Sequence, residues 1–268
     1  MDLSKELAEA LAAADMAGRY VLDEYRAFVP IPDAPAEIST HVDREAQEII
    51  LRHLRAAFPA DGMRAEEQTP SAKVESANAA RVWVVDPIDG TRGFARKNGE
   101  FSVMIGFTVN SRAILGVVLE PVANRVTYAA AGLGCWVRTG TGEPVRCRVS
   151  SQRNLASSIL VQSHTKPGAK PKPVVAAVEP GHVVETYSAG IKLAMVARGE
   201  VDSYVNDYAN FHDWDACAGH VLVEEAGGTV TLFNGEPITY KGPVTRRGLL
   251  ATNGFLHDEC VTRLSTIV

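Results

Sequence analysis

Two aspartates stand at the end of a short apolar run in which β-branched residues dominate. The run Val82 to Val85 predicts a buried strand, and Asp86 and Asp89 follow it closely. A strand in a protein core has no need of two carboxylates at its exit, so their placement asks for a chemical reason. Carboxylates bind hard cations such as Mg2+, which keep several waters and share substrate phosphate oxygens. The pair therefore predicts a metal-and-phosphate site at the carboxyl end of this strand.

The residues next to these acids suit the same site. Pro87 fixes φ and sharpens the turn, and Gly90 removes a side chain where a ligand must approach the main chain. Thr91 supplies a hydroxyl beside the acids, and free amides after Gly90 suit a phosphate. The alternative is an ordinary turn closed by an aspartate side chain, which a bare D-P-x-D-G string favours just as well. The longer string D-P-I-D-G-T and its partners elsewhere in the chain favour the metal site.

This string also carries a resemblance to a known family. Residues 86–91, D-P-I-D-G-T, closely resemble the signature of the inositol-monophosphatase-like superfamily of magnesium-dependent, often lithium-sensitive phosphatases. Residues 214–219, W-D-A-C-A-G, and residues 224–228, E-E-A-G-G, resemble the family's second signature. The two signatures stand in the expected order, and the segments between them also match, so the resemblance covers nearly the whole chain. It implies an α+β fold, a layered αβαβα sandwich of the inositol monophosphatase and fructose-1,6-bisphosphatase type.

The resemblance implies roles for individual residues. Glu66 stands in a segment that matches the family's G-E-E motif, although Ala65 replaces the common glycine, and it would be both a metal ligand and a catalytic residue. Asp43 and Thr91 would orient the attacking water. The amides of Gly90 and Thr91 would hold phosphate oxygens. The implied metal ligands are Glu66, Asp86, Ile88 through its carbonyl, Asp89 and Asp215, around roughly two or three Mg2+ ions.

Without the family, three of these residues have plainer interpretations. The pattern Thr40-x-x-Asp43 resembles a capping box, which makes Asp43 a helix-start charge stabilised by the helix dipole. Glu66 and Glu67 are neighbours in an extended segment and point to opposite sides, so at most one can readily enter a shared site. Asp215 would be the N-cap of a helix.

Details around the motifs narrow the family to a subclass. Residues 92–94, R-G-F, and 96–105, R-K-N-G-E-F-S-V-M-I, look like bacterial 3'(2'),5'-bisphosphate nucleotidases. That likeness implies hydrolysis of adenosine 3',5'-bisphosphate to AMP and phosphate. The implied substrate-binding residues are Gly90, Thr91, Ser163, His164 and Lys192. Two departures weaken the subclass: Ala189 stands where nucleotidases have serine, and Asp207 lies in the segment where several carry arginine.

Other functions stay open. Within the superfamily the rivals are hydrolysis of inositol-1-phosphate, histidinol-phosphate and fructose-1,6-bisphosphate. A different class is a non-catalytic, phosphate-binding regulator on this fold, and the presence of every acid of the implied metal shell argues against it.

Bulk properties set the broad class. The chain has 268 residues, of which 46% are hydrophobic and 22% charged, an ordinary globular composition. Its net charge of -5 argues against a nucleic-acid polymer as partner, because proteins that bind nucleic acids usually need a basic face.

The four cysteines are widely spaced and include no C-x-x-C pair, which predicts free thiols in a reducing compartment. The acidic, amphipathic start is no secretion signal, and no apolar stretch has membrane-spanning length. We therefore expect a cytoplasmic protein with no membrane partner and a small-molecule phosphate monoester as substrate, and a homodimer stays open.

The hydrophobic pattern divides the chain near residue 150. We expect an N-terminal α+β subdomain, residues 1–150, whose largely antiparallel sheet carries Glu66 and the D-P-I-D-G-T motif. A C-terminal α/β subdomain, residues 151–268, would carry the W-D motif and the specificity residues.

A surface loop is expected from Lys73 to Ala80. Helices are expected over Leu3 to Phe28, from Thr40 onward, over Ser188 to Arg198, over Asp215 to Glu225 and from about Leu256 to the end of the chain. The predicted strands beyond Val85 are Ser102 to Val109, Ala113 to Leu119, Arg125 to Ala130, Gly134 to Arg138, Val145 to Val149, Ser158 to Gln162, Val174 to Val178, Val183 to Thr186, Thr229 to Phe233 and Gly248 to Thr252.

Overall fold

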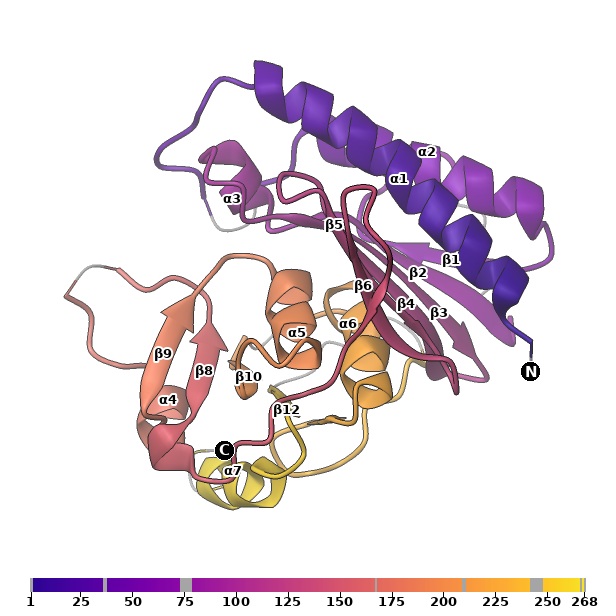
Figure 1. Cartoon of the computed structure of the whole chain (residues 1–268). Helices are drawn as coiled ribbons and strands as arrows, with labels where there is room; N and C mark the ends of the chain where they lie inside the picture. Colours follow the sequence, from indigo (N-terminus) through magenta and orange to yellow (C-terminus); the bar gives the residue numbers. More distant parts are fainter. Residues whose placement is uncertain are drawn as a thin grey trace.

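The alanine-rich start of the chain forms a long helix, as predicted. In the computed structural model, which describes residues 2–35, 38–72, 79–166, 168–208, 211–241, 248–265 and 267, α1 spans Ser4–Ala27. It buries Ala10, Ala13, Ala14 and Ala17, whose small side chains at near-helical spacing let the helix lie close to its neighbours. The second helix, α2 (His41–Ala57), packs beside α1, and the two helices form the outer layer over one sheet (Figure 1).

The sheet beneath these helices has, among the described residues, seven strands in chain order. Neighbours from β2 to β7 pair antiparallel, which confirms the predicted, largely antiparallel sheet, whereas β1 runs parallel to β2. Successive side chains of a strand point to opposite faces, so Trp83 and Val85 join the core under α1 and α2, while Val84 joins the core on the other side. The strands are β1 (Gly62–Ala65), β2 (Arg81–Asp89), β3 (Ser102–Val109), β4 (Arg112–Glu120), β5 (Arg125–Ala130), β6 (Gly134–Thr139) and β7 (Val145–Arg146).

Two helices from the second half of the chain form the central layer. Helix α5 (Ala189–Ala197) packs beside α6 (Asp213–Glu225), and α6 contacts strands of both sheets. Gly116 of β4 makes this approach possible, because a Cβ there would lie 2.1 Å from the carbonyl oxygen of Ala218. The close contact fixes α6 against the first sheet and so determines where the first turn of the helix lies.

In the described part of the chain, the second sheet has five strands in the order β11-β12-β10-β8-β9. Strands β8, β9 and β10 run parallel, and β12 runs antiparallel to β10. Helices α4 (Pro173–Val178) and α7 (His257–Leu264) contact each other, and α7 also contacts β12, so they form the last layer (Figure 1). The alternation of helices and sheets confirms the α+β layered sandwich. The strands are β8 (Ile159–Gln162), β9 (His182–Glu185), β10 (Ser203–Asn206), β11 (Thr229–Thr231) and β12 (Leu249–Thr252), and two short helices are α3 (Thr91–Ala95) and the 3-10 helix Leu155–Ser157.

One prediction for the second half of the chain was wrong. The run Val174 to Val178, expected as a strand, is helix α4. Pro173 occupies the first helical position, where its missing N–H costs nothing. Val174, Val175 and Val178 then lie on one side of the helix and are buried with residues of α7. A five-residue apolar run has no periodicity that separates the two structures, so packing decided the outcome.

Smaller differences concern single strands and segments. Strand β10 was not predicted, and β7 is shorter than the predicted Val145 to Val149. Of the expected surface loop from Lys73 to Ala80, residues 73–78 lie outside the described part of the chain. The predicted absence of a disulfide framework agrees with the described structure, in which all four cysteines are buried and none forms a disulfide. The division near residue 150 stays a prediction. Among the described helices, none is both long and apolar enough to cross a bilayer.

Candidate metal and phosphate site

Glu66 and Asp86 lie at the same edge of the first sheet. Strand β1 ends at Ala65, which is in register with Val85 of the parallel strand β2. The amide of Glu66 donates to the carbonyl oxygen of Val85 at 3.2 Å and extends this pairing by one residue. Because the carboxyl ends of parallel neighbours meet at one edge, the two acids lie side by side, with their carboxyl groups in hydrogen-bonding contact.

Asp86 and Asp89 share the site because β2 is irregular between them. Residues three apart in a regular strand point to opposite faces. The pairing of β2 with β3 shifts register between Asp86 and Asp89, which is where Pro87 removes an N–H from the ladder. One oxygen each from Asp86, Asp89 and Asp215 consequently lie within 4.8 Å of one another, a spacing at which three carboxylates could hold a metal ion.

Asp215 reaches the site from the first turn of α6. The helix begins at Asp213, two residues earlier than predicted, so Asp215 is its third residue rather than its N-cap. One carboxylate oxygen of Asp215 accepts the amide of His212 and closes the helix start. The neighbouring Asp213 is bonded to Arg64 of β1, which ties this turn to the strand that precedes Glu66. The sequence pattern did not predict this ion pair, because Arg64 and Asp213 are 149 residues apart in the chain.

We call the four acids of this site the acidic cup: Glu66, Asp86, Asp89 and Asp215. Burial and mutual repulsion raise the pKa values of Glu66, Asp86 and Asp215. Burial raises the pKa of Asp215 to about 7, and the charge of Asp89 adds to the effect. Burial also raises the pKa of Glu66, helped by the Asp215 charge, and raises that of Asp86 well above its usual range, helped by Glu66. In the absence of a cation, the neutral forms of Glu66 and Asp86 are therefore favoured near neutral pH, and a divalent cation must displace protons to bind.

Two residues that the sequence did not single out hold Asp89 in place. The hydroxyl of Ser188 donates to Oδ2 of Asp89, and the amide of Gly190 donates to the same oxygen at 2.7 Å. Both donors belong to the start of α5, where Ser188 is also the N-cap. Because both use Oδ2, Oδ1 keeps its lone pairs for a cation. An N-cap serine before a predicted helix was the only signal in the sequence, and it indicates a helix start rather than a site.

Asp43 and Thr91 are in direct contact beside the cup. Thr91 Oγ1 lies 2.9 Å from Asp43 Oδ1 and 2.9 Å from the carbonyl oxygen of Ile88. Asp43 is buried at the start of α2, where its Oδ2 accepts the amide of Thr40 at 2.9 Å. The predicted capping box therefore exists, and the same carboxylate also faces the site. Burial raises the pKa of Asp43, and the hydrogen bonds from Thr40 and Thr91 oppose this rise.

Gly90 has to be a glycine. Its φ of +86° lies in the left-handed region, and a Cβ would lie 2.7 Å from the carbonyl oxygen of Glu100 and 3.2 Å from Cα of Ser188. Gly90 caps α3, the single turn that begins at Thr91. The first amides of a helix have no partner inside it, so the amides expected to hold phosphate stand directly after Asp89.

Ser163 and Lys192 are in hydrogen-bonding contact. Lys192 is fully buried, and its Nζ donates to Ser163 Oγ at 3.0 Å and to the carbonyl oxygens of Thr186 and Tyr187 at 3.0 and 2.8 Å. Burial lowers its pKa to about 8, against the opposing attraction of Asp89. All three donors of the ammonium are thus used by the protein, and a contact with a substrate phosphate would require one of these bonds to open.

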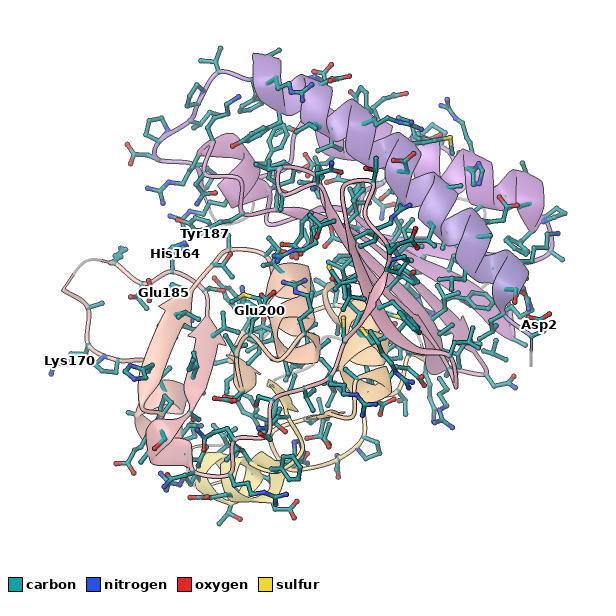
Figure 2. All side chains as sticks on the ribbon, viewed as in Figure 1. Asp2, His164, Lys170, Glu185, Tyr187 and Glu200 are labelled. Carbon is teal, nitrogen blue, oxygen red and sulfur yellow. The ribbon has the colours of Figure 1, made fainter. Side chains whose placement is uncertain are left out.

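His164 lies at the carboxyl ends of β8 and β9, in a group with Tyr187 and Glu185 (Figure 2). Its Nε2 is 2.7 Å from a carboxylate oxygen of Glu100, and its Nδ1 is 3.4 Å from one of Glu185. The ring packs against Tyr187 with a centroid distance of 4.4 Å. His164 is therefore held by two acids and an aromatic ring, and no contact joins it to the acidic cup in the described structure.

The two departures from the nucleotidase pattern have ordinary surroundings. Ala189 is the first residue of α5 and packs against the central core. Asp207 follows β10 and pairs with Lys172 at 3.3 Å.

Comparison with known proteins bears on the whole chain. Residues 2–268 match the profile of the inositol monophosphatase family. The chain is 32% identical over 235 residues to fructose-1,6-bisphosphatase/inositol-1-monophosphatase of Thermotoga maritima, covering 87% of this chain and 84% of that protein. It is 30% identical over 265 residues to histidinol-phosphatase of Mycobacterium tuberculosis, covering 97% and 98%. The structure of inositol monophosphatase from Anabaena (Nostoc) sp. PCC 7120 superposes with a TM-score of 0.82 at 28% identity, covering 100% of this chain and 98% of that one. The profile match and these relatives confirm the resemblance read from the two signatures: the chain belongs to the inositol monophosphatase family of phosphatases.

Proposed function

We propose that the protein is a Mg2+-dependent phosphomonoesterase whose site is the acidic cup. The observation that carries this proposal is the convergence of Asp86, Asp89 and Asp215 oxygens within 4.8 Å, with Glu66 in contact with Asp86. The cup offers only oxygen donors, which suits Mg2+ and is poor for zinc. The four acids and the carbonyl of Ile88 would hold roughly two or three ions. When bound, such ions lower the pKa of a water and stabilise negative charge on the phosphate and the leaving oxygen.

The chain's own residues would place the water and the phosphate. A water that donates to Thr91 Oγ1 can pass its proton toward Asp43 Oδ1, because Thr91 already donates to that oxygen. Burial raises the pKa of Asp43, which makes it a better proton acceptor than an exposed aspartate. The amides of Gly90 and Thr91 would donate to phosphate oxygens. Unaided phosphate monoester hydrolysis is so slow that the site must lower the barrier by over ~20 kcal/mol, which hydrogen bonds alone cannot provide.

For the substrate we propose a 3'(2'),5'-bisphosphate nucleotide, with adenosine 3',5'-bisphosphate converted to AMP. The support is the R-G-F and R-K-N-G-E-F strings after the first signature and the cationic surroundings of the cup, where Arg92 and Arg96 both contact Tyr187. Ser163, His164 and Lys192 would shape this side of the pocket. Arginines beside the cup favour a substrate with a second negative group over one with an amine.

A second candidate is histidinol-phosphate, because the relative from Mycobacterium tuberculosis aligns with nearly the full length of this chain. Its amine would have to pair with an acid, and the acids near His164 already have protein partners. Inositol-1-phosphate and fructose-1,6-bisphosphate are further rivals, since the Thermotoga maritima relative carries both activities in its name.

A phosphate-release assay over these four substrates tests the proposal. We expect release to require Mg2+, to stop with EDTA and to be most efficient, in kcat/KM, with adenosine 3',5'-bisphosphate. Much faster turnover of histidinol-phosphate or inositol-1-phosphate would overturn the substrate assignment and leave the phosphatase standing. Binding of Mg2+ without release of phosphate from any substrate would instead favour a non-catalytic regulator.

A further inference from the structure

We propose that Arg92, Arg96 and Tyr187 form a second anion subsite beside the acidic cup, which binds the phosphate of a bisphosphate substrate that is not hydrolysed. The inference rests on the proposed phosphatase function and adds a location for substrate discrimination. An anion can bind to these three residues without their touching the acidic cup. What carries it is their charge, their lack of acidic partners and their position.

Arg92 has a charge that the protein leaves uncompensated. Its guanidinium lies over the ring of Tyr187, 5.5 Å from the centroid, and within the described residues it has no ion pair and no side-chain hydrogen bond. Its Nε is buried without a partner, which is a costly state for a donor. Within the described part of the chain, five of the six other partly or largely buried arginines are paired with a carboxylate: Arg64 with Asp213, Arg81 with Asp61, Arg125 with Glu120, Arg198 with Glu120 and Glu200, and Arg263 with Glu179 and Glu259. The sixth, Arg55, also has a buried Nε without a partner, but its guanidinium donates to the carbonyl oxygen of Ser71 at 2.8 Å.

Arg96 adds a second guanidinium on the same ring. Its Nη1 donates to the hydroxyl of Tyr187, and its centre lies 5.9 Å from the ring centroid. The described structure gives it no carboxylate partner. Arg92 and Arg96 are four residues apart around α3, so they lie on the same side of this turn. The ring of Tyr187 thus gathers two positive charges into one place.

The acids nearest to this place are already engaged. Glu100 binds His164 at 2.7 Å and the amide of Tyr187 at 3.2 Å. Glu185 accepts from Gln162 and Thr165 at 2.9 and 2.8 Å. The hydrogen bonds of Glu100 and Glu185 therefore direct both carboxylates to partners other than the two guanidiniums. The guanidiniums of Arg92 and Arg96 can then bind an anion.

The subsite is close to the cup along two separate segments of chain. Arg92 is three residues beyond Asp89, so their Cα atoms are at most about 11 Å apart. Tyr187 is adjacent to Ser188, whose hydroxyl donates to Asp89. Figure 2 shows Tyr187 next to His164 at the ends of β8 and β9 that face α3. An anion bound here would lie one small-molecule length from a phosphate in the cup.

The chemistry of these groups specifies the ligand class. Guanidiniums bind phosphate with paired hydrogen bonds, and the exposed Arg96 is accessible to a substrate entering from solvent. A substrate with two phosphates therefore gains a contact that a monophosphate lacks, and a cationic substrate is repelled. A nucleoside bisphosphate and a sugar bisphosphate share this chemistry, so both belong in the test.

The test compares substrates that differ by one phosphate: adenosine 3',5'-bisphosphate with 3'-AMP, and fructose-1,6-bisphosphate with fructose-1-phosphate. In the double variant Arg92→Gln/Arg96→Gln we expect KM for the favoured bisphosphate to rise by roughly 10-fold or more. We expect kcat to stay nearly constant and KM for the matching monophosphate to change much less. If KM rises selectively for adenosine 3',5'-bisphosphate, the subsite binds the second phosphate of a nucleotide. If it rises selectively for fructose-1,6-bisphosphate, the subsite binds that of a sugar. The single variant Arg96→Gln, at an exposed side chain, guards against a folding defect and should show part of the effect.

Arg153→Gln is the matched control. Arg153 also lies over an aromatic ring, that of Phe255, but it precedes β8 at the strand end opposite to His164. The Arg153→Gln variant should have the same KM as the wild type for both bisphosphates and both monophosphates. An equal rise of KM for bisphosphate and monophosphate, or no rise for either, would overturn the subsite.

A binding measurement separates failure of the subsite from failure of the phosphatase assignment. With Ca2+, which takes oxygen ligands in a looser geometry than Mg2+, calorimetric titration of adenosine 3',5'-bisphosphate and 3'-AMP needs no turnover. A preference for the bisphosphate that the double variant loses supports the subsite, even if no substrate is hydrolysed. Equal affinity of the wild type for both ligands contradicts it, whatever the assay of activity shows.

Discussion

The hydroxyl of Thr91 lies 2.9 Å from Oδ1 of Asp43, a residue 48 positions earlier in the chain. The contact joins the first turn of α3 to the first turn of α2. The other oxygen of Asp43 is held by the amide of Thr40 at 2.9 Å and by its hydroxyl at 2.6 Å. The hydrogen bonds that start α2 thus also aim the carboxylate at Thr91, so one side chain serves both the fold and the site.

Asp43→Asn tests the role of this pair in proton acceptance. The amide keeps the size of the side chain but is a much weaker proton acceptor, so we expect kcat to fall by about 100-fold or more. Mg2+ activation should keep its midpoint, because Asp43 is outside the acidic cup. Steady-state kinetics over a range of Mg2+ concentrations separates the two effects. Thr40→Ser, which keeps the capping hydroxyl, is the control, and a loss that excess Mg2+ restores would contradict the assignment.

Asp86→Asn tests the acidic cup itself. Asp86 is buried beside Glu66, and burial raises its pKa well above the usual range. Folding without a cation therefore requires this acid to take up a proton, a cost that the neutral amide avoids, so the variant should keep the fold. We expect activity to be lost, by more than the roughly 10–100-fold typical of residues that only support a metal ligand. We also expect the melting temperature in EDTA to be at least that of the wild type, and the increase produced by Mg2+ to be smaller.

Asp207→Asn is the matched control for that experiment. It makes the same chemical change at an acid that pairs with Lys172 at the end of β10. Its Mg2+ response should follow the wild type. Near-normal turnover in Asp86→Asn, or an equal loss of the Mg2+ response in both variants, would contradict the role of the cup.

The sequence predicted the parts of this site that lie close together in the chain. The apolar run before Asp86, the breaker Pro87 and the glycine at position 90 are local signals, and the structure places them as expected at the end of β2. Helix α2 was predictable for the same reason, because Thr40 and Asp43 form their capping box within one turn. The position of Glu66 beside Asp86 followed only from the family, since a parallel pair of strands has no local signature.

Contacts between distant segments were not predictable from the pattern. Ser188 and Gly190 hold Asp89 across about a hundred residues, and an N-cap serine looks alike whether or not it also binds an acid. Tyr187 gains its meaning only from Arg92 and Arg96, which approach it from another layer. The valines from 174 to 178 suited a strand locally, and their burial with α7 made them a helix.

The affinity for Mg2+ should depend on pH. Burial raises the pKa of Asp215 to about 7, and the pKa values of Glu66 and Asp86 are raised as well. Below these values the acids hold protons that a cation must displace, so affinity should fall as the pH drops from 8 to 6, by up to about tenfold per pH unit for each proton released. Calorimetry in buffers of different ionisation enthalpy measures those protons directly. Equal affinity at pH 6 and pH 8, with no proton release, would contradict this account.

Lys192 should give the stability of the protein a characteristic pH dependence. Burial lowers the pKa of Lys192 from its ordinary value of 10.5 to about 8. Between these values the unfolded chain holds a proton that the folded chain lacks, so this residue makes the free energy of unfolding increase as the pH rises from about 8 to 10.5. The increase is on the order of 3 kcal/mol. Below pH 8 the buried ammonium is charged, and the oxygens of Ser163, Thr186 and Tyr187 offset only part of its desolvation.

Lys192→Met isolates this contribution, since every other titrating group stays in both proteins. Urea unfolding at several pH values from 7 to 10.5 should show the wild type gaining stability relative to the variant across the window, whatever the offset between them at pH 7. Lys170→Met, at an exposed lysine in the segment after β8, removes one lysine without removing a buried charge, and its curve should stay parallel to that of the wild type. If the curves of the wild type and Lys192→Met are also parallel, then Lys192 is not a buried ammonium of lowered pKa. Its three oxygen contacts would then have to compensate its desolvation fully at every pH.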